Sequence, residues 1–511
     1  MSTYLSFTVF LLFIWCLKKL VALSSNFGRS APYPPGPQPK PLIGNALDFP
    51  TTNAHEVYIE WGKRYQSSFV YGSAFGNKTL ILNKLEDADE LLEQRAKKYS
   101  SRPLIPTTEL MGWDSWNFAL FPYGKTWRFH RQISQQNFRS EAAVGYRPLM
   151  LKKAHEMCHR LLLDSTNFEQ HNKMLSISMT MMAMYGYEVK SFDDPCIAAA
   201  TESTTLSAPL LYPGATLVNV IPGLAKMPIP AWFPGAKTWK MATRVRDLGK
   251  IAERIPFEFV KESIAQGTAV DSVLSKFFRK KEEFGASDTE EKALRDIATT
   301  VYSAASDTTI SSTQSFFYLM AVNPQIQRKA QAEIDRVIGH SRLPDFGDRS
   351  ALPYLEAIYR EVLRFAPPLP LGVPHATTED DYYKGYFIPK GTVVFGNIWA
   401  MTRDEDLYDE PFKFNPERFL DESGNIDNNK RILAYGFGRR VCVGKYMASS
   451  TMWIIIASVL ACFNIEKAKD EFGNEIEITG DYDDLGAALH KSEFRCSFVP
   501  RSATIKQLLT V

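Results

Sequence analysis

Cysteine is scarce in this sequence. The 511 residues hold six cysteines, and none is paired with another in a CxxC or CxxxC spacing. A disulfide framework or a structural zinc site needs clustered cysteines, so the spacing argues against both. Scattered thiols fit a reducing compartment, where each is a small buried hydrophobe unless its surroundings indicate otherwise.

Net charge is also nearly absent. Lys and Arg total 59, Asp and Glu total 57, and the formal net charge is +2. Bulk charge therefore gives no sign of a nucleic-acid partner. No internal repeat, low-complexity block or Gly/Ser linker follows the N-terminal region, so we expect one large domain despite the length.

Long apolar runs are limited to two places, and the first lies at the N-terminus. It extends from Leu5 to Leu17 and ends at Lys18 and Lys19. A cleaved signal peptide carries its positive charge before the apolar run, whereas here the charge follows it. The positive-inside rule then places the rest of the chain in the cytosol. We expect residues 1–23 to be a transmembrane signal anchor, residues 24–44 a proline-rich hinge and residues 45–511 the catalytic domain.

Helical patterns dominate after residue 44, which predicts a mainly α fold with small β-sheets. The longest pattern, Glu290–Val322, is apolar all round in its middle and should cross the core. The second apolar run, Met452–Phe463, is too short to span a bilayer and predicts a buried core helix. The predicted strands are Phe69–Val70, Thr79–Leu82, Tyr386–Ile388, Val393–Val394 and Phe494–Val499.

One cysteine, Cys442, lies in the glycine-rich stretch YGFGRRVCVG just before that core helix. A dinucleotide-binding GxGxxG would need glycine at Val441, and a phosphate loop would need it at Arg439. A cysteine nucleophile would want a histidine base, and none is near in sequence, although one could come from elsewhere in the fold. After these tests, two interpretations of Cys442 stand against each other: a buried structural thiol, which is the default for a lone cysteine, and a thiolate that acts as a ligand.

The surroundings of Cys442 predict a lowered thiol pKa. A helix N-terminus, backbone N–H groups made accessible by Gly436, Gly438 and Gly444, and the guanidinium of Arg440 would all stabilise the thiolate. No second thiol or histidine lies in range to complete a zinc or iron–sulfur shell. An axial ligand to heme is therefore the natural candidate.

The stretch resembles the heme-binding loop F-G-x-G-x-R-x-C-x-G of the cytochrome P450 superfamily, with Tyr435 in place of the first phenylalanine. The resemblance implies the cytochrome P450 fold and a heme b whose iron is axially ligated by Cys442. EVLR, with Glu361 and Arg364, resembles the family's E-x-x-R, and Arg418 in FNPERF completes its charged triad. On pattern alone Glu361 and Arg364 lie on a solvated helix face, whereas the resemblance implies a buried network that supports the cysteine loop.

AASDTT, residues 304–309, resembles the family's oxygen-activating motif. The resemblance gives the hydroxyl of Thr308 a bond to oxygen and makes the carboxyl of Asp307 a proton relay, at a bend in the helix. The alternative is that the threonine bonds its own backbone one turn back. An aspartate within a core helix is costly unless it is used, which favours the functional interpretation. Ala305 stands where the family usually has glycine.

The resemblance also implies a set of residues that bind the heme propionates. WRFHR places Trp127 and Arg131 one helical turn apart, which suits two donors to one anion. The other members are Arg440, His375 in GVPHA and Arg102 in SSRP.

The reaction implied is NADPH-dependent monooxygenation, in which one oxygen atom of O2 enters a hydrophobic small molecule. Electrons would come from a separate NADPH–cytochrome reductase, with cytochrome b5 as a further donor, and Arg439 and Lys445 would help to dock it. We expect a single-pass protein of the endoplasmic reticulum membrane. Expected substrate contacts are Leu110–Phe121 with Trp113, Trp116 and Phe118, the helix near Ala304, Pro367–Val373 and Leu485–Ala488.

The apolar segment Leu224–Ala236 is expected to dip into the bilayer. YSSRP and PAWFPGA resemble fungal microsomal members that oxidise secondary metabolites such as terpenoids, polyketides and alkaloids. Two alternatives remain: a heme-thiolate isomerase or dehydratase, and a non-enzymatic heme sensor. Neither needs the acid and alcohol of Asp307 and Thr308, so that pair argues against both.

Overall fold

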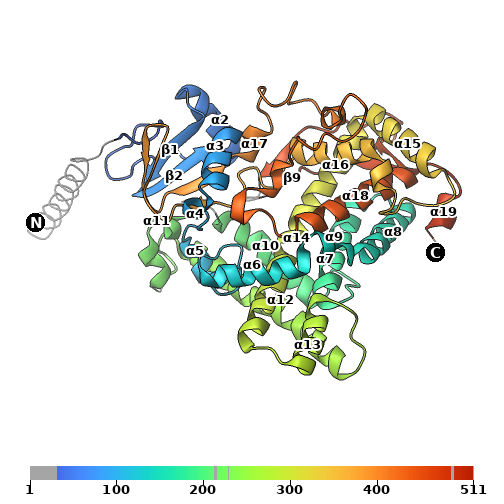
Figure 1. The fold of residues 1–511 in the computed structure, drawn as a ribbon, viewed down its shortest axis with the longest axis horizontal. Coiled ribbons are helices and arrows are strands. Elements are labelled where there is room, and N and C mark those ends of the chain that lie inside the picture. The colour runs from blue at the N-terminus through green and yellow to red at the C-terminus, as the bar shows by residue number, and fades with distance from the viewer. Residues whose placement is uncertain (1–30, 212–215, 228–229, 485–487, 510–511) are drawn as a thin grey trace, which may run out of the picture.

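A computed structural model describes residues 31–211, 216–227, 230–484 and 488–509 (Figure 1). The predicted anchor, part of the predicted hinge and residues 485–487 lie outside these ranges. Within them, helices dominate and the strands are short, which confirms the predicted fold class. The helices of the first half are α2 Ala54–Arg64, α3 Leu85–Ala88, α4 Ala96–Tyr99, α5 Pro106–Leu110, α6 Lys125–Phe138, α7 Ser140–Val144, α8 Arg147–Leu163, α9 Phe168–Tyr185, α10 Pro195–Ser207, α11 Leu217–Val220 and α12 Ala236–Ala265.

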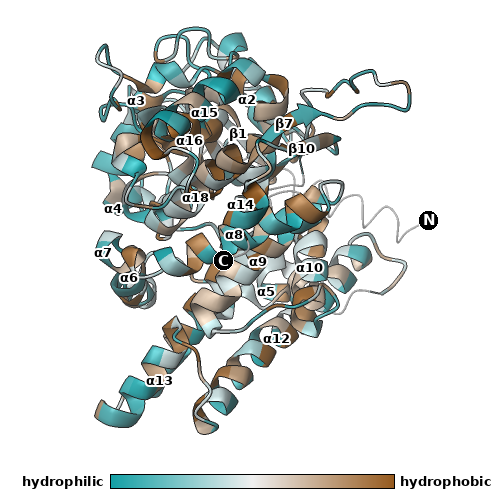
Figure 2. Ribbon diagram, turned by 90° about the vertical axis from the view of Figure 1, so that its right-hand side faces the viewer, coloured by the Kyte–Doolittle hydropathy of each residue, from teal (hydrophilic) through white to brown (hydrophobic). Residues whose placement is uncertain are grey.

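The helices of the second half include the two long helices that were predicted to lie in the core, α14 and α18. They are α13 Val273–Phe284, α14 Asp288–Val322, α15 Pro324–Ile338, α16 Pro353–Phe365, α17 Ile398–Met401, α18 Lys445–Cys462 and α19 Ile505–Leu508. Figures 1 and 2 both show α12 and α13 extending away from the body that holds α14, α16 and α18.

Helix α14 crosses the core, as predicted. It begins two residues before the predicted start because Ser287 caps it: the Ser287 hydroxyl accepts from the Glu290 N–H, and the Glu290 carboxylate accepts from the Ser287 N–H. Acidic residues in the first turn suit the positive end of the helix dipole. The helix ends at Val322, before Pro324, which opens α15.

Helix α18 is the second core helix. Every residue from Ser450 to Cys462 is buried. Among the described residues, α18 alone is long and apolar enough to cross a membrane, but 72% of it is covered inside the fold. It is therefore a core helix, as the sequence predicts, and β7 begins directly at Phe463.

The strands form one four-stranded sheet, β1-β2-β6-β3, and three two-stranded antiparallel sheets, β10-β7, β4-β5 and β8-β9. Strand β2 pairs antiparallel with β1 and parallel with β6. All five predicted strands are present, with boundaries that differ by up to four residues. The strands are β1 Phe69–Ala74, β2 Asn77–Leu82, β3 His375–Ala376, β4 Asp381–Tyr383, β5 Tyr386–Ile388, β6 Val393–Gly396, β7 Phe463–Lys467, β8 Tyr482–Asp484, β9 Leu489–Lys491 and β10 Cys496–Pro500.

Candidate functional site

Cys442 lies in a tight loop that ends at the first turn of α18. Its N–H donates to the Tyr435 carbonyl at 2.8 Å, which closes the loop. Arg440 and Phe437 on the same loop are buried, whereas Cys442 itself is exposed. The loop therefore presents the thiol while Phe437 and Arg440 are packed inside the fold.

The glycines of this loop serve different purposes. Gly438 has φ +56°, and a Cβ there would lie 2.1 Å from the Leu92 carbonyl oxygen, so glycine is required by close packing against Asp89–Gln94. The Gly444 N–H donates to the Cys442 sulfur. The predicted role of the glycines in opening N–H groups to the sulfur thus applies to Gly444 and not to Gly438.

The predicted lowering of the Cys442 pKa is wrong for the protein alone. Although part of the Cys442 side chain is open to solvent, many protein atoms surround its sulfur. This desolvation is the largest cause and raises the pKa of the thiol, while the Gly444 N–H, Arg131 and Lys445 act in the opposite direction. Arg131 and Lys445 are the cations that act on the Cys442 sulfur, whereas the Arg440 guanidinium bonds the carbonyls of Ser100 and Phe121. A coordinating thiol is deprotonated by the metal it binds, so a bound cation would supply the missing stabilisation.

Arg440 is packed against Trp127, with its guanidinium carbon 4.1 Å from the ring centroid. Its Nε and Nη2 donate to the carbonyls of Ser100 and Phe121, each at 2.7 Å. Its Nη1 is buried and has no partner. A buried guanidinium with an unpaired N–H is costly unless a further acceptor binds there.

Arg102 and His375 lie next to each other because Ser101 bridges to Ala376. Arg102 donates from Nη1 to the carbonyls of Val373 and Pro374, at 2.7 and 2.8 Å. His375 contacts the Tyr99 carbonyl through Nδ1 at 2.8 Å, which leaves Nε2 for another partner.

These cations influence one another. Burial, then Arg102 and Arg131, lower the pKa of Arg440 to about 8, and burial, then Arg102, lowers the pKa of His375 well below its usual value. Within the described ranges, no carboxylate forms an ion pair with Arg102, Arg131 or Arg440. Buried cations without a counter-charge destabilise a fold unless an anion binds among them. A heme, with two carboxylates beside an iron that accepts a thiolate, matches this donor set.

Helix α14 presents Ala304 as an exposed residue between the buried Tyr302 and Ser306. Val301 and Thr308, which lie three residues before and four residues after Ala304 on the same face, are only partly buried, as is the adjacent Ala305. The Thr308 hydroxyl donates to the Ala304 carbonyl at 3.1 Å, which is the backbone bond that the sequence left as the alternative. The helix is continuous through this segment, from Asp288 to Val322.

Asp307 has a partner that sequence reasoning missed. Its Oδ1 lies 3.1 Å from Nε2 of His490, on β9. The two residues are 183 positions apart in the sequence, and no local pattern connects them. Only the folding of the β8–β9 hairpin against α14 brings them together.

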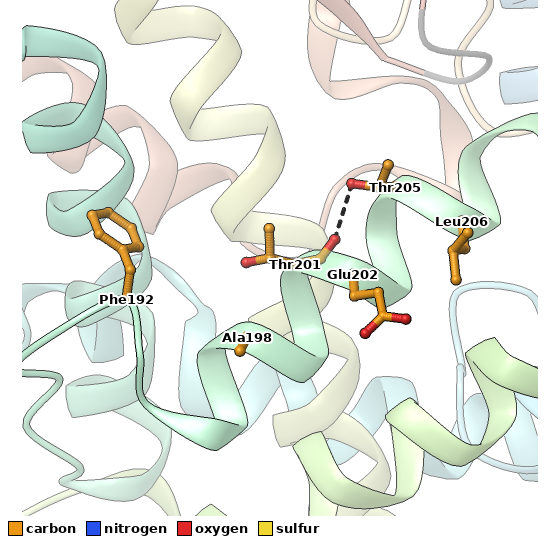
Figure 3. A pocket seen from close by; sticks show the side chains of 6 residues that line it. All are labelled: Phe192, Ala198, Thr201, Glu202, Thr205 and Leu206. Atoms are coloured by element: carbon orange, nitrogen blue, oxygen red, sulfur yellow. Dashed lines mark hydrogen bonds between the residues drawn. The ribbon is translucent and has the colours of Figure 1, made fainter.

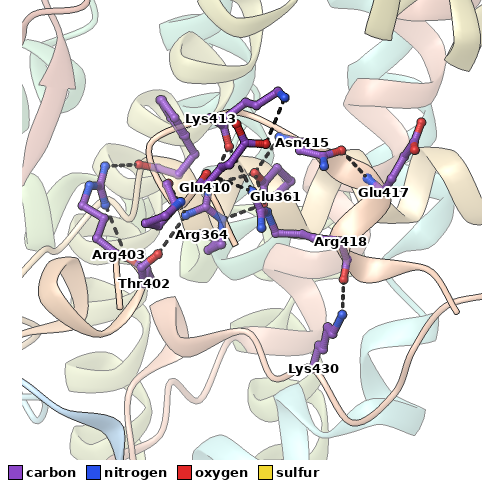
Figure 4. Close-up of polar contacts among 12 residues, drawn as sticks. Glu361, Arg364, Thr402, Arg403, Glu410, Lys413, Asn415, Glu417, Arg418 and Lys430 are labelled. Atoms are coloured by element: carbon purple, nitrogen blue, oxygen red, sulfur yellow. Dashed lines mark hydrogen bonds and ion pairs between the residues drawn. The ribbon is translucent and has the colours of Figure 1, made fainter. Parts of the chain in front are cut away.

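Glu361 and Arg364 are fully buried, which shows that the solvated-face pattern is misleading. Figure 4 shows the polar contacts that link these two side chains and Arg418. Arg364 donates from Nε and Nη2 to the two Glu361 oxygens at 2.6 and 2.8 Å, and Arg418 Nε donates to Glu361 at 3.2 Å. The remaining Arg364 Nη1 bonds the carbonyls of Thr402 and Pro411. The triad therefore links α16 to the chain around Thr402, Pro411 and Arg418, which follows α17.

The predicted substrate-contact segments are divided between core and open positions. Trp113 packs among buried residues of α11 and α12, and Phe118 packs with Trp127. Trp116 is half-buried, and its carbonyl accepts the Thr300 hydroxyl at 3.3 Å, so the segment lies against α14. Ala488 is buried, and the rest of the predicted tip lies outside the described residues.

A hollow of about 440 Å³ lies elsewhere, along the outer face of α10 (Figure 3). No lining residue belongs to the segments expected to bind heme or substrate, so this hollow is separate from the site. Its lining residues are Phe192, Ala198, Thr201, Glu202, Thr205 and Leu206.

Comparison with known proteins places the sequence among characterised families. Residues 34–480 match the family model described as cytochrome P450. The cytochrome P450 monooxygenase COX2 of Coprinopsis cinerea is 37% identical over 96% of this chain and 93% of its own length. The monooxygenase ple1 of Rhodocybe pseudopiperita is 37% identical over 93% of this chain and 91% of its own. The corresponding values for eriA of Hericium erinaceus are 36%, 94% and 91%.

Proposed function

This chain belongs to the cytochrome P450 family and is a heme-dependent monooxygenase, and from that premise we propose that Cys442 ligates the iron and that the substrate is a hydrophobic secondary metabolite. The observation that carries the proposal is the group of buried cations beside an exposed thiol. Nothing else in the described fold needs such an arrangement, and a heme needs both parts of it.

The residues assigned to the heme would bind different parts of it, either the iron or the propionates. Cys442 would bind the iron from the loop before α18, while the unpaired Nη1 of Arg440 would donate to a propionate. Arg131 and Trp127, through its indole N–H, would complete the propionate site. His375 would join them once the propionate charge favours its protonated form, because Nδ1 already donates to the Tyr99 carbonyl and only the protonated ring also donates from Nε2. Arg102 already donates to three carbonyls, so its part is chiefly to hold the loop of His375 in place.

The bound heme supplies the iron at which O2 is reduced with electrons that originate from NADPH. The chain supplies orientation and protons. Asp307 would deliver protons along α14, and the hydroxyl of Thr308 would turn from the Ala304 carbonyl toward the reacting oxygen. Exchange of a weak helix bond for a functional one costs little, because a threonine hydroxyl can rotate without moving the backbone.

The substrate would lie against the open face of α14 at Val301, Ala304 and Ala305. This face is apolar, and so are the neighbouring Trp116 and Leu369, which are half-buried. The relatives come from fungi, and the ligand chemistry favoured by such a lining is a small apolar compound such as a terpenoid or an aromatic polyketide.

A separate reductase would dock on the surface beside the cysteine loop. The guanidinium groups of Arg128 and Arg439 both stack on the ring of Tyr123. Lys445, in the first turn of α18, is close enough to Cys442 to affect its pKa. This basic surface lies on the thiol side of the site, where charge complementarity would guide an acidic electron donor.

The location proposed is the endoplasmic reticulum membrane, with residues 1–23 as the anchor and residues 45–511 as the cytosolic domain. Figure 1 shows β1, β2 and α11 at the same end of the molecule. Large apolar residues are exposed in the segments around these elements, and Trp232 is 81% exposed, which supports contact with a bilayer there. They are Leu42, Leu47, Phe75, Met227 and Trp232.

The test is reconstitution of the purified protein with NADPH, a reductase and a panel of terpenoid and aromatic compounds. The proposal expects oxygenated product that requires both NADPH and O2, with one atom of labelled O2 in the product. Product formed from a substrate peroxide without NADPH would favour the isomerase or dehydratase alternative. Heme binding without any turnover would favour the sensor.

A further inference from the structure

The contact between Asp307 and His490 joins a charged side chain of α14 to the substrate-side hairpin. From Ile297 to Val322, Asp307 is the only charged residue of the helix. Its Oδ1 lies 3.1 Å from His490 Nε2, and the side chains are 32% and 15% exposed. The Nε2–H of His490 does not point at the Asp307 oxygen well enough to count as a hydrogen bond. Such poor alignment is common for a proton-transfer pair before substrate binds.

The hairpin is held in register with α14 by its backbone. The Ser311 hydroxyl, one turn after Asp307, donates to the Leu489 carbonyl at 2.6 Å. The Leu489 N–H donates to the Pro368 carbonyl at 2.9 Å, in the loop after α16. Strand β9 is therefore fixed on both sides, and the position of His490 follows from these two bonds.

The other charged groups near His490 have different partners. Asp483 lies opposite His490 in the β8–β9 register, is exposed, and accepts the Ser492 hydroxyl at 2.8 Å. Lys491 points to the other face of the strand and donates to the carbonyls of Asp481 and Ser492. Asp307 is thus the carboxylate that faces Nε2.

We propose that His490 is the proton donor to Asp307, so that protons reach the oxygen site from solvent through the hairpin. This inference rests on the proposed function of Asp307. The His490 ring suits this task because its two nitrogens differ. Nε2 is buried and faces the Asp307 carboxylate, whereas Nδ1 does not belong to the buried atoms that lack a hydrogen-bond partner. Nδ1 first takes a proton from water, so that both ring nitrogens carry one, and Nε2 then gives its proton to Oδ1 of Asp307. The neutral ring is left with its proton on Nδ1 and returns to the Nε2–H tautomer by exchange with water.

The proton balance sets the expected phenotype. Coupled turnover consumes O2, substrate, NADPH and one proton and yields hydroxylated product, water and NADP+. When a proton is not delivered to the oxygen atom that should leave as water, the same two electrons and two protons leave with O2 as hydrogen peroxide, and the substrate is unchanged. A defect in His490 therefore diverts NADPH oxidation from product to peroxide without preventing electron transfer.

The experiment compares His490→Ala and His490→Gln with the wild-type holoenzyme, reconstituted with reductase and a substrate that the wild type oxidises. Glutamine keeps a side-chain donor but cannot pass a proton on. We expect both variants to form product about tenfold more slowly, the usual loss when a supporting residue is removed. Peroxide release should rise, and the solvent deuterium isotope effect on product formation should increase. The matched control is His340→Gln, an exposed histidine that also lies near an aspartate.

A second readout needs no turnover. In a double-mutant cycle of His490→Ala and Asp307→Asn, the losses in unfolding free energy of the ferric protein should be non-additive. Additive losses, or full recovery of coupled turnover in His490→Gln, would overturn the proton route. A wild-type enzyme that never forms NADPH-dependent product, in spite of a non-additive cycle, would overturn the monooxygenase assignment of the site and the route with it.

Discussion

The hydroxyl of Tyr435 lies 2.8 Å from the hydroxyl of Tyr359. Tyr435 opens the cysteine loop at the position where the family pattern has phenylalanine, and Tyr359 is on α16, two residues before Glu361. Burial raises the pKa of both phenols, so both stay protonated and one donates to the other. The departure from the family pattern thus adds a hydrogen bond between the loop and the helix that supports it.

Replacement of Tyr435 by phenylalanine should lower the free energy of unfolding by about 1 kcal/mol, because the Tyr359 hydroxyl loses a buried partner. The double variant Tyr359→Phe with Tyr435→Phe should be less destabilised than the sum of the single variants, since the hydrogen bond between the two phenols can be lost only once. Urea unfolding of the four proteins measures this. Strictly additive losses would show that the bond contributes nothing.

The cysteine loop and its supporting helix show what the sequence could predict. The order of motifs predicted that Cys442, Arg440 and His375 belong to one site, since their residue types and spacings resemble those of the family's heme-binding motifs. The bond between Tyr435 and Tyr359 could not be predicted, because it depends on which side of α16 faces the loop. A pattern of apolar positions describes one helix and does not say what covers its other faces.

Glu361→Gln should destabilise the holoenzyme by about 3–5 kcal/mol, because it leaves the buried guanidinium groups of Arg364 and Arg418 without their shared carboxylate. Glu356→Gln, on the same helix and paired with Arg349 and Arg360, is the matched control. Glu356 keeps some contact with water, so its loss should be smaller. Heme content after expression and the urea midpoint report both effects, and equal losses would contradict the account.

Arg440→Leu should release heme about tenfold faster than the wild type, since a residue that supports a metal group typically contributes that much to its retention. Arg439→Leu changes the adjacent, exposed arginine and should retain heme normally. Its expected defect is weaker reductase binding at low salt, because a surface charge acts through steering. Transfer of heme to an excess of apomyoglobin measures the first rate; identical rates in both variants would contradict the propionate assignment.

Acid should destabilise the protein through buried histidines. Burial lowers the pKa of His55 to about 4, so between pH 6.5 and 4 the unfolded chain binds a proton that the folded chain does not. Stability is therefore lost as the pH falls through this window, by up to about 3 kcal/mol from His55. Unfolding free energies of the wild type and His55→Phe, measured from pH 7 to 4, should converge toward pH 4. A constant difference across this range would show that His55 titrates normally.

The contacts of α14 mark the limit of sequence reasoning. Asp307 stood out because an aspartate in an apolar helix needs a reason, but nothing in its neighbourhood pointed to His490 across a long stretch of chain. The solvated pattern around Glu361 led away from the buried triad, and only the family resemblance corrected it. The expected thiol pKa was wrong because desolvation by surrounding protein atoms outweighs the charges near Cys442. The sequence does not show how many atoms the fold packs around the sulfur.

The most direct measurement is the absorption spectrum of the ferrous–CO complex of the wild type and of Cys442→Ser. The account predicts that the wild type shows the long-wavelength Soret band of a thiolate-ligated heme. The variant should either lose heme or bind CO with the band of a non-thiolate heme. An unchanged long-wavelength band in Cys442→Ser would contradict the assignment of Cys442 as the iron ligand, and the site built around it.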